Sequence, residues 1–303
     1  MPERFRRWEP GFPVEVSSAV APLRRGSGDP CLRRDEAGRL WLTANTEGGP
    51  GTLVFVRRAD GAIEAKAWGG GAEVLLDGLP ALLGADDDDA GFVAHHDAVA
   101  ASRRQRPLLR LGATGRVWDV LIPAVLEQKV TGIEARRSWR ELCRRFGEPA
   151  PGPVPAGMRL PPTPEAIRSI VDWNWHRAGV DLSRRAALIA AASVAHRLER
   201  AVELRGAEGR AWLRKVPGIG VWTAAEVAQR AWGDPDAVSF GDFHIPAVVG
   251  HALVGRALDD EGLQSVLAPY APQRQRAVRY VEAAGFSRPR FGPRYPVRDY
   301  RAI

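Results

Sequence analysis

Short apolar runs broken by glycine-containing turns occupy the first ninety residues. These runs are rich in β-branched and aromatic residues, which favours strands. The predicted strands are Leu40–Thr43, Thr52–Val56 and Glu64–Trp68. Leu75–Leu83 is expected to form part of a short helix. The pattern therefore predicts a small β-containing domain over residues 1–90.

From about Phe92 the apolar positions recur at spacings of three and four, which is typical of helices. The predicted helices are Asp97–Arg104, Val117–Phe146, Thr163–Asp172, Ser183–Leu204, Gly209–Lys215, Val221–Trp232, Phe243–Val254, Asp259–Ala268 and Gln273–Ala284. Residues 148–164 hold seven prolines and two glycines and predict a loop. We therefore expect an α+β fold: the N-terminal domain, a helical region over residues 91–285, and an extended basic tail over residues 286–303.

Composition narrows the possible partners and compartment. The 303 residues carry a net charge of +7, which favours a polyanion such as nucleic acid or an anionic membrane surface. Because no stretch of about 18 apolar residues occurs, no membrane span is expected. The two cysteines, Cys31 and Cys143, have no zinc-like spacing, so we expect a reducing compartment without a disulfide framework. The charged N-terminus does not resemble a secretory signal. The acidic run Asp86–Asp89 fits either a metal site or a solvated loop, and we favour the loop.

The most informative segment is the turn between two predicted helices at Val216–Gly220. Pro217 cannot continue the first helix, and Gly218 and Gly220 leave the backbone bare. The exposed amides of the turn and of the following helix N-terminus could then bind a phosphate. Ile219, between the glycines, would anchor the turn in the core. The alternative is an ordinary corner between two helices.

Three motifs in this order resemble the helix-hairpin-helix (HhH-GPD) DNA glycosylases. The first is Val117–Gln128, which resembles the first core helix of that superfamily. The second is the hairpin with the Trp222-Thr223-Ala224 that follows it, and the third is Asp242, 22 residues after Gly220 and just before a predicted helix. The resemblance covers about residues 90–285, and the N-terminal domain fits the AlkA-like 3-methyladenine DNA glycosylase II branch.

The resemblance implies a base-excision repair enzyme that acts as a monomer on damaged double-stranded DNA in the bacterial cytoplasm, at the nucleoid. It implies two helical subdomains with the active-site cleft between them. Asp242 would be the catalytic carboxylate, stabilising positive charge on the sugar. It would also serve as an N-cap of the helix after it. The DNA-binding residues implied are Gly218, Ile219, Gly220, Thr223, Gln128, Lys129 and His244. His244 fits an orienting role or simple packing, and Lys129 a wedge or a phosphate contact.

The position of the strand-cleaving lysine in bifunctional relatives is Trp222 here, and Lys215 lies on the wrong side of the hairpin. The resemblance therefore implies a monofunctional enzyme with water as the nucleophile. With only two cysteines, the four-cysteine iron–sulfur loop of some relatives is missing. No cofactor is required, although a monovalent cation at the hairpin fits the resemblance. No metal-ligating residues are predicted.

The predicted base pocket contains Trp222, Glu226, Trp173 and Trp175. Alkylated purines are cationic, so stacking on Trp222 suits them. Two other pocket aromatics of the AlkA-like branch are replaced, by Glu226 and near Glu282. Glu226 could attract a cationic base, hydrogen-bond a neutral one, or simply be a surface residue. Trp173 and Trp175 fit core packing as well as a pocket.

Other interpretations remain open at this stage. Arg184 and Arg185 fit phosphate contacts or a solvated helix face. The leading interpretation of the function is an alkylated-purine glycosylase. The alternatives are a glycosylase for oxidised purines or other lesions, a DNA-binding module without catalysis, and a basic helical interaction protein.

Overall fold

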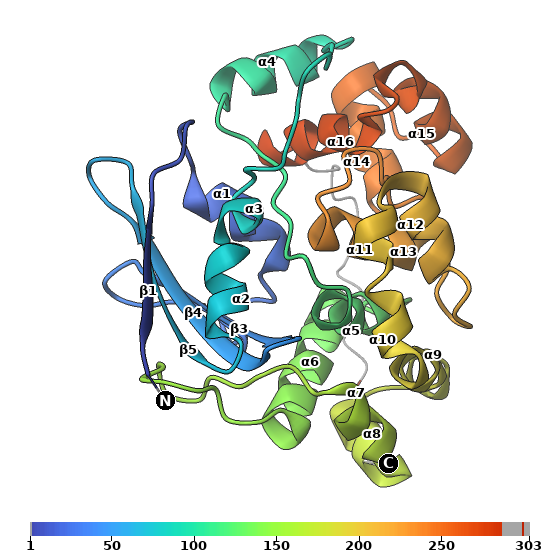
Figure 1. Cartoon of the computed structure of the whole chain (residues 1–303). Helices are drawn as coiled ribbons and strands as arrows, with labels where there is room; N and C mark the ends of the chain where they lie inside the picture. The colour runs from blue at the N-terminus through green and yellow to red at the C-terminus, as the bar shows by residue number, and fades with distance from the viewer. Residues whose placement is uncertain (1, 287–298, 300–303) are drawn as a thin grey trace.

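The computed structural model describes residues 2–286 and Asp299, and the N-terminal part of the chain is built on a five-stranded antiparallel sheet (Figure 1). The strand order is β1-β5-β4-β3-β2. The strands are β1 Arg4–Trp8, β2 Leu32–Arg34, β3 Leu40–Thr46, β4 Gly49–Arg57 and β5 Ile63–Gly69. The predicted strands correspond to β3, β4 and β5. The edge strands β1 and β2 lack the apolar alternation that marks a strand in the sequence.

Short helices cover one face of this sheet. They are α1 Val16–Val20, α2 Ala72–Asp77 and α3 Leu79–Leu82, with a 3-10 turn at Ala21–Leu23. Helix α2 packs on β4 and β5, where alternate residues such as Phe55 and Ile63 are buried with Leu79. The sheet and these helices thus share one apolar core.

The rest of the described chain is helical, as predicted. The helices are α4 Asp97–Gln105, α5 Trp118–Leu126, α6 Gly132–Phe146, α7 Pro164–Ser169, α8 Asp172–Ala178, α9 Leu182–Ser193, α10 Ala195–Leu198, α11 Ala201–Leu204, α12 Gly206–Leu213, α13 Val221–Ala231, α14 Ile245–Val254, α15 Asp260–Leu267 and α16 Arg274–Ala283, with a 3-10 turn at Ala268–Tyr270. The predicted helix over 117–146 is divided in two by a turn in which Lys129 has a φ of +54°. After that turn, Thr131 and Glu134 form a capping box that starts α6.

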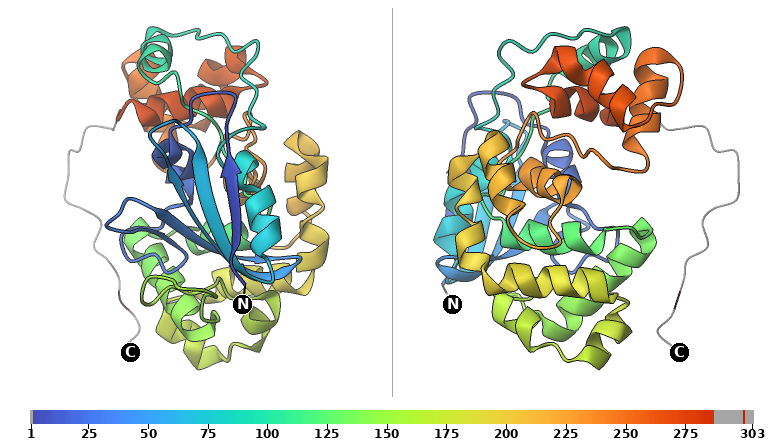
Figure 2. Two further views of the ribbon diagram at one scale, coloured as in Figure 1. Left: turned by 60° about the vertical axis from the view of Figure 1, so that its left-hand side comes forward. Right: turned by 90° about the vertical axis from the view of Figure 1, so that its right-hand side faces the viewer.

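The helices gather around two separate apolar clusters. The larger cluster contains residues from α5, α6, α9 and α13, such as Leu121 and Leu188. The smaller one joins α4 to α14, α15 and α16 (Figures 1 and 2), although α4 precedes α5 in the chain. Asp242 lies in the segment between α13 of the first cluster and α14 of the second.

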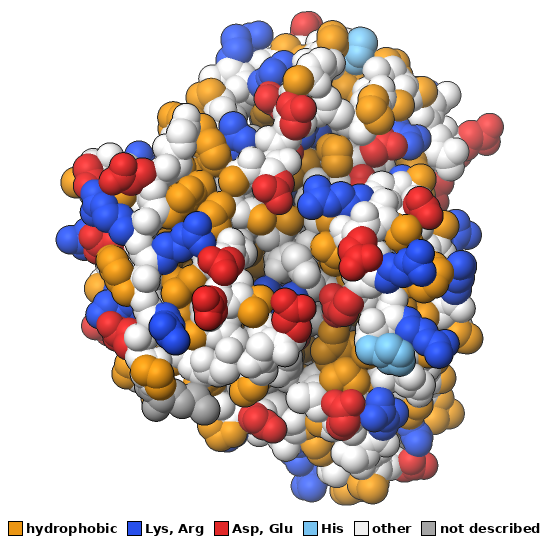
Figure 3. All heavy atoms as spheres, in the orientation of Figure 1, with side chains coloured by type: hydrophobic (Ala, Val, Ile, Leu, Met, Phe, Trp, Pro, Cys, Tyr) orange, Lys and Arg blue, Asp and Glu red, His pale blue; other side chains and the backbone are white. Residues whose placement is uncertain are grey.

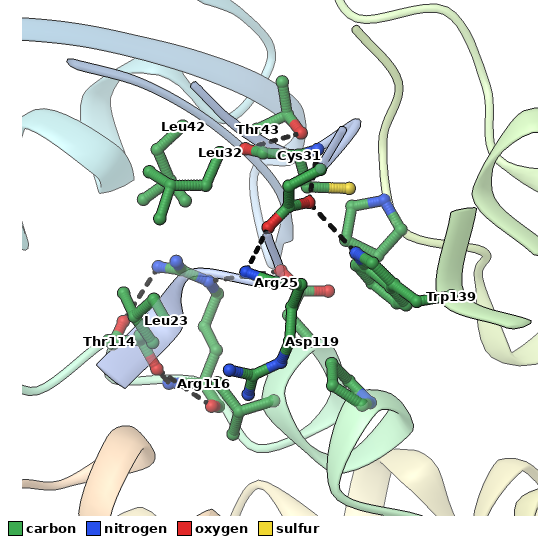
Figure 4. Close-up of a pocket in the computed structure, with 14 residues that line it drawn as sticks. Leu23, Arg25, Cys31, Leu32, Leu42, Thr43, Thr114, Arg116, Asp119 and Trp139 are labelled. Carbon is green, nitrogen blue, oxygen red and sulfur yellow. Dashed lines mark hydrogen bonds and ion pairs between the residues drawn. The ribbon is translucent and has the colours of Figure 1, made fainter. Parts of the chain in front are cut away.

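Side-chain hydrogen bonds join the N-terminal sheet to the helices. Trp139 of α6 donates its indole N–H to Asp29 (3.0 Å), and the Asn45 backbone N–H donates to Asp119 of α5 (3.1 Å). A cavity of about 50 Å³ lies at this junction, lined by Arg25, Asp119 and residues of both parts (Figure 4). The N-terminal unit is therefore anchored on α5 and α6.

The acidic run Asp86–Asp89 is neither a metal site nor a simple solvated loop. Asp87 forms a buried ion pair with Arg276 of α16 (2.6 Å), and Asp89 pairs with Arg103 (2.9 Å). These pairs attach the loop to α16 and α4. No helix among the described residues is long and apolar enough to cross a membrane. Of the tail predicted over 286–303, all but Phe286 and Asp299 lies outside the described residues.

Candidate active site

The hairpin between α12 and α13 is held in the core by two apolar residues and exposes its glycines. Val216 and Ile219 are buried, whereas Gly218 and Gly220 are exposed. Gly218 has a φ of +85°, and a Cβ there would lie 2.6 Å from Cβ of Ala187 on α9. Glycine is therefore required at position 218 by both backbone conformation and packing.

Gly220 is not required for packing or backbone conformation, but it leaves the N-terminus of α13 accessible. A Cβ at this position would meet nothing within 4 Å, and its φ of −87° suits any residue. Gly220 precedes α13, and no side chain of the described residues caps that helix. The first N–H groups of α13 are consequently available to an anion from solution.

Gln128 braces this hairpin. Its Nε2 donates to the Gly218 carbonyl oxygen and to Oγ1 of Thr223, both at 2.9 Å. Thr223 is buried. Both side chains support the hairpin from within the protein, and their predicted contact with DNA stays a prediction.

Asp242 is only partly buried and lies next to the N-terminus of α14. Its Oδ1 accepts the backbone N–H groups of His244 (2.7 Å) and Ile245 (2.9 Å). Its Oδ2 accepts the indole N–H of Trp222 (3.0 Å). The carboxylate is thus held in one orientation by three donors. Helix α14 begins at Ile245 with His244 as its N-cap, so the predicted N-cap position of Asp242 was wrong by two residues, although its side chain still accepts the N–H of the first helical residue.

The residues around Asp242 are open to solvent. Phe243 is 71% exposed, and the His244 ring, also exposed, meets it edge-on with ring centroids 5.0 Å apart. Sequence reasoning missed Phe243, although an exposed aromatic beside the candidate carboxylate is suited to stacking on a base. Lys129 is exposed in the turn beside Gln128.

Two predicted pocket residues are not in the site. Trp175 is 1% exposed and donates its indole N–H to the Ile170 carbonyl oxygen (3.2 Å), so it belongs to the core. Trp173 lies on the same short helix, α8, exposed and stacked on His176. Helix α8 packs on α6 and lies at the opposite end of the molecule from α14 (Figure 1). The base-pocket prediction was wrong for both tryptophans, because an aromatic-rich segment in sequence carries no information on which face it packs.

Neither arginine that opens α9 is a free phosphate contact. Arg184 is buried, pairs with Asp181 (2.6 Å) and donates to the Leu126 carbonyl oxygen (3.0 Å). Arg185 pairs with Asp172 (2.5 Å). Arg184 therefore joins α9 to the end of α5, next to Gln128.

Glu226, one turn after Trp222 on α13, is buried and paired. It accepts a hydrogen bond from Ser239 (2.5 Å) and forms an ion pair with Arg230 (2.8 Å). No surface role remains for it, which resolves the alternative left open by the sequence. Arg230 and Ser239 were not singled out in the sequence, because their proximity arises only when the segment before α14 folds against α13.

The face drawn in Figure 3 carries no single basic patch. The face in Figure 3 mixes Lys and Arg with Asp and Glu, and acidic groups surround its central hollow. Among the described residues, no group of three or more His, Cys, Asp or Glu side chains is placed to hold a metal ion. At the hairpin, the carbonyl oxygens of Val216 and Gly218 each accept one hydrogen bond and keep a second lone pair, which fits a monovalent cation.

Several solved structures of DNA glycosylases are similar to this chain. A 3-methyladenine DNA glycosylase from Archaeoglobus fulgidus superposes with a TM-score of 0.76 at 16% identity, covering 91% of this chain and 96% of its own. An 8-oxoguanine glycosylase/lyase from Clostridium acetobutylicum, in complex with double-stranded DNA containing cytosine opposite 8-oxoguanine, gives 0.68 at 10% identity, with 90% and 91% covered.

A third structure, MBOgg1 in complex with a low-affinity DNA ligand, gives a TM-score of 0.71 at 14% identity, covering 93% of this chain and 98% of its own. No protein-family model matches the sequence, and no curated protein matches it. The similarity extends over nearly the whole chain, so the predicted fold, with its N-terminal β-containing part, is confirmed.

Proposed function

We propose that this chain is a monofunctional DNA glycosylase of base excision repair that removes damaged, alkylated purines from duplex DNA. The proposal depends on one observation above all. A partly exposed carboxylate, Asp242, is oriented by Trp222 of α13, the same helix whose uncapped N-terminus is available to a phosphate. The glycosylase fold supports the same conclusion.

The proposed reaction needs little more than positioning and charge. The damaged nucleotide leaves the stack, and the phosphate next to it binds the exposed amides of Gly220 and Val221 at the start of α13. Cleavage of the N-glycosidic bond builds positive charge on the sugar, which the Asp242 carboxylate stabilises. Water then adds to the sugar and gives an abasic site, with Asp242 accepting its proton.

The absence of an amine nucleophile in the right place supports the monofunctional assignment. The indole of Trp222 occupies the position of the lysine in strand-cleaving relatives, and its N–H is already donated to Asp242. Lys215 holds its ammonium over the Trp212 ring, 4.1 Å from the centroid, on the other side of the hairpin. The enzyme is proposed to act as a monomer in the bacterial cytoplasm, without a required cofactor; a monovalent cation at the hairpin would stiffen the phosphate-binding turn.

A set of duplexes, each with one defined lesion, tests this proposal. Base release followed by alkali treatment should give cleavage at 7-methylguanine, and no strand break should appear without alkali. Asp242→Asn keeps an oxygen for capping α14 and should reduce base release by a factor of at least about 100. Borohydride should trap no covalent protein–DNA adduct.

The alternatives give different results in the same experiment. Release of 8-oxoguanine but not of 7-methylguanine would identify an oxidised-purine enzyme. Salt-sensitive DNA binding without release of any base would identify a binding module. Strand breaks without alkali, or a borohydride adduct, would exclude the monofunctional mechanism.

A further inference from the structure

A row of polar side chains leads inward along α13 from the candidate catalytic carboxylate. Trp222, Glu226 and Arg230 are spaced four residues apart and therefore lie on one face of the helix. Trp222 contacts Asp242 at the outer end of this row. At the inner end, Nε of Arg230 donates to the Pro22 carbonyl oxygen of the N-terminal unit (2.9 Å). A base drawn in past Trp222 would meet this row.

Arg25 brings a second guanidinium to the inner end of the row. It is 6% exposed, and its Nε has no hydrogen-bond partner among the described residues. That nitrogen lies 3.8 Å from Oε1 of Glu127, the residue that precedes the hairpin-bracing Gln128. The two groups form an ion pair, but their separation is too long for a direct hydrogen bond.

In the described part of the chain, Glu127 is held only by this long ion pair with Arg25. Its side chain is 25% exposed and accepts no hydrogen bond within residues 2–286. Solvent, and hence a ligand, can reach it. Leaving a buried donor without an acceptor is costly, so a buried N–H beside a half-buried carboxylate indicates a hydrogen bond that a ligand could complete.

The electrostatics place these charges in one cluster. Burial and the nearby Arg230 lower the pKa of Arg25, while Glu127 and Glu226 act in the opposite direction. Burial also opposes the charge of Arg230, yet Glu226 and Glu127 raise its pKa above the usual value. Two guanidiniums and two carboxylates thus surround the inner end of the row and balance one another.

We infer that Arg25 and Glu127 form a donor–acceptor pair that reads the hydrogen-bonding edge of the extruded base. A Watson–Crick edge carries an N–H next to an acceptor atom, and such an edge can bridge a donor and a carboxylate that do not reach each other. Glu226 and Arg230 form an ion pair of their own, so they add no net charge beside Arg25 and Glu127. The inference rests on the proposed glycosylase function.

The pair defines a substrate class. Purines altered at N3, N7 or C8 keep the Watson–Crick edge and would be accepted, whether alkylated or oxidised. Purines blocked at N1 or across N1 and the exocyclic group would leave Arg25 and Glu127 unsatisfied and would be rejected. Selection by this edge differs from selection by stacking of a cationic ring alone.

Matched lesions separate this inference from the proposed function. We would compare single-turnover base release from duplexes with 7-methylguanine and 1,7-dimethylguanine, and with 8-oxoguanine and 1-methyl-8-oxoguanine. In each pair only the N1 position differs. The unblocked member should react at least about 100-fold faster, because the blocked one leaves buried polar groups unpaired.

The variants then assign the selection to the pair. Glu127→Gln keeps the size of the side chain and should reduce release of the unblocked lesion by about 10- to 100-fold, with little change for the blocked one. Arg25→Met removes the donor and should have the same effect. Glu261→Gln on α15 changes the same charge at an exposed position and should behave as wild type. Affinity for a duplex with an abasic-site analogue shows that each variant is folded and binds DNA.

The outcomes are distinct. If no member of either pair is released, the proposed function fails. If bases are released but blocked and unblocked members react equally, or if Glu127→Gln leaves their ratio unchanged, edge reading by this pair is wrong and the glycosylase assignment stands.

Discussion

Trp222 donates its indole N–H to Asp242 across 3.0 Å, and this bond joins the helix that follows the hairpin to the start of the next one. One carboxylate oxygen is thereby directed by a side chain and the other by the α14 backbone. DNA binding at the hairpin and chemistry at Asp242 are consequently linked through a single side chain.

Trp222→Phe tests that link. Phenylalanine keeps an aromatic ring for stacking but cannot donate to Asp242. Loss of one hydrogen bond to a charged group corresponds to about 1.5–3 kcal/mol, so we expect single-turnover base release to slow by about 10- to 100-fold. Affinity for undamaged duplex should stay within about twofold. An unchanged release rate would contradict the orienting role of the indole.

The two hairpin glycines should respond differently to alanine. Gly218→Ala places a Cβ against Ala187 at a positive φ and should lower the free energy of unfolding by about 2–4 kcal/mol. Gly220→Ala meets open space and should lower it by less than about 1 kcal/mol. It should nevertheless weaken duplex binding, because the new methyl group projects where a phosphate would bind.

Urea denaturation and binding titrations measure these two effects separately. Equal destabilisation by both alanines would mean that packing against α9 does not set the requirement at position 218. Unaltered duplex affinity of Gly220→Ala would argue against phosphate binding at the start of α13.

Asp119, in the junction cavity of Figure 4, should make stability depend on pH. Burial raises the pKa of its carboxyl to about 6 from a usual 3.8, although Arg116 opposes the shift. The folded state therefore holds a proton that the unfolded state has lost between about pH 4 and pH 6. Stability from this group is complete below pH 4 and is lost as the pH rises through 6, by about 3 kcal/mol in total.

Asp119→Asn removes this dependence, so the variant should gain stability relative to wild type as the pH rises from 4.5 to 7. Urea denaturation at several pH values checks this. Asp77→Asn, whose carboxylate is 73% exposed, is the matched control for loss of one charge. A variant-to-wild-type difference that stays constant over this pH range would refute the burial effect.

Sequence reasoning identified the hairpin from local rules, whereas Asp242 and Trp222 were singled out by their positions in the motifs that resemble the HhH-GPD glycosylases. Glycine at a positive φ, a carboxylate before a helix and an apolar residue between two glycines are all readable from neighbours in the chain. The break in the helix predicted over residues 117–146 could not be read in the same way. The chain leaves the helix at Lys129, which has a left-handed backbone conformation although it is not glycine, and helix propensity does not predict such a residue.

The rest of the site depends on contacts between distant segments. Arg25 and Glu127 are about one hundred positions apart. Glu127 lies within the Val117–Gln128 motif, but nothing in that motif points to Arg25. Trp175 shows the converse: a conspicuous aromatic that the fold uses only for its core. Period and composition predict which residues are buried, but not which polar residues are buried together.

The double engagement of Asp242 restricts how this position can change. One oxygen starts α14 and the other faces the indole, so folding and chemistry draw on the same side chain. Only asparagine keeps the length of the side chain and one oxygen that can accept the N–H groups at the start of α14. Every shorter or apolar replacement would destabilise that helix as well as abolish the reaction. Selection for a stable helix would thus preserve an oxygen at this place even in a descendant that had abandoned catalysis.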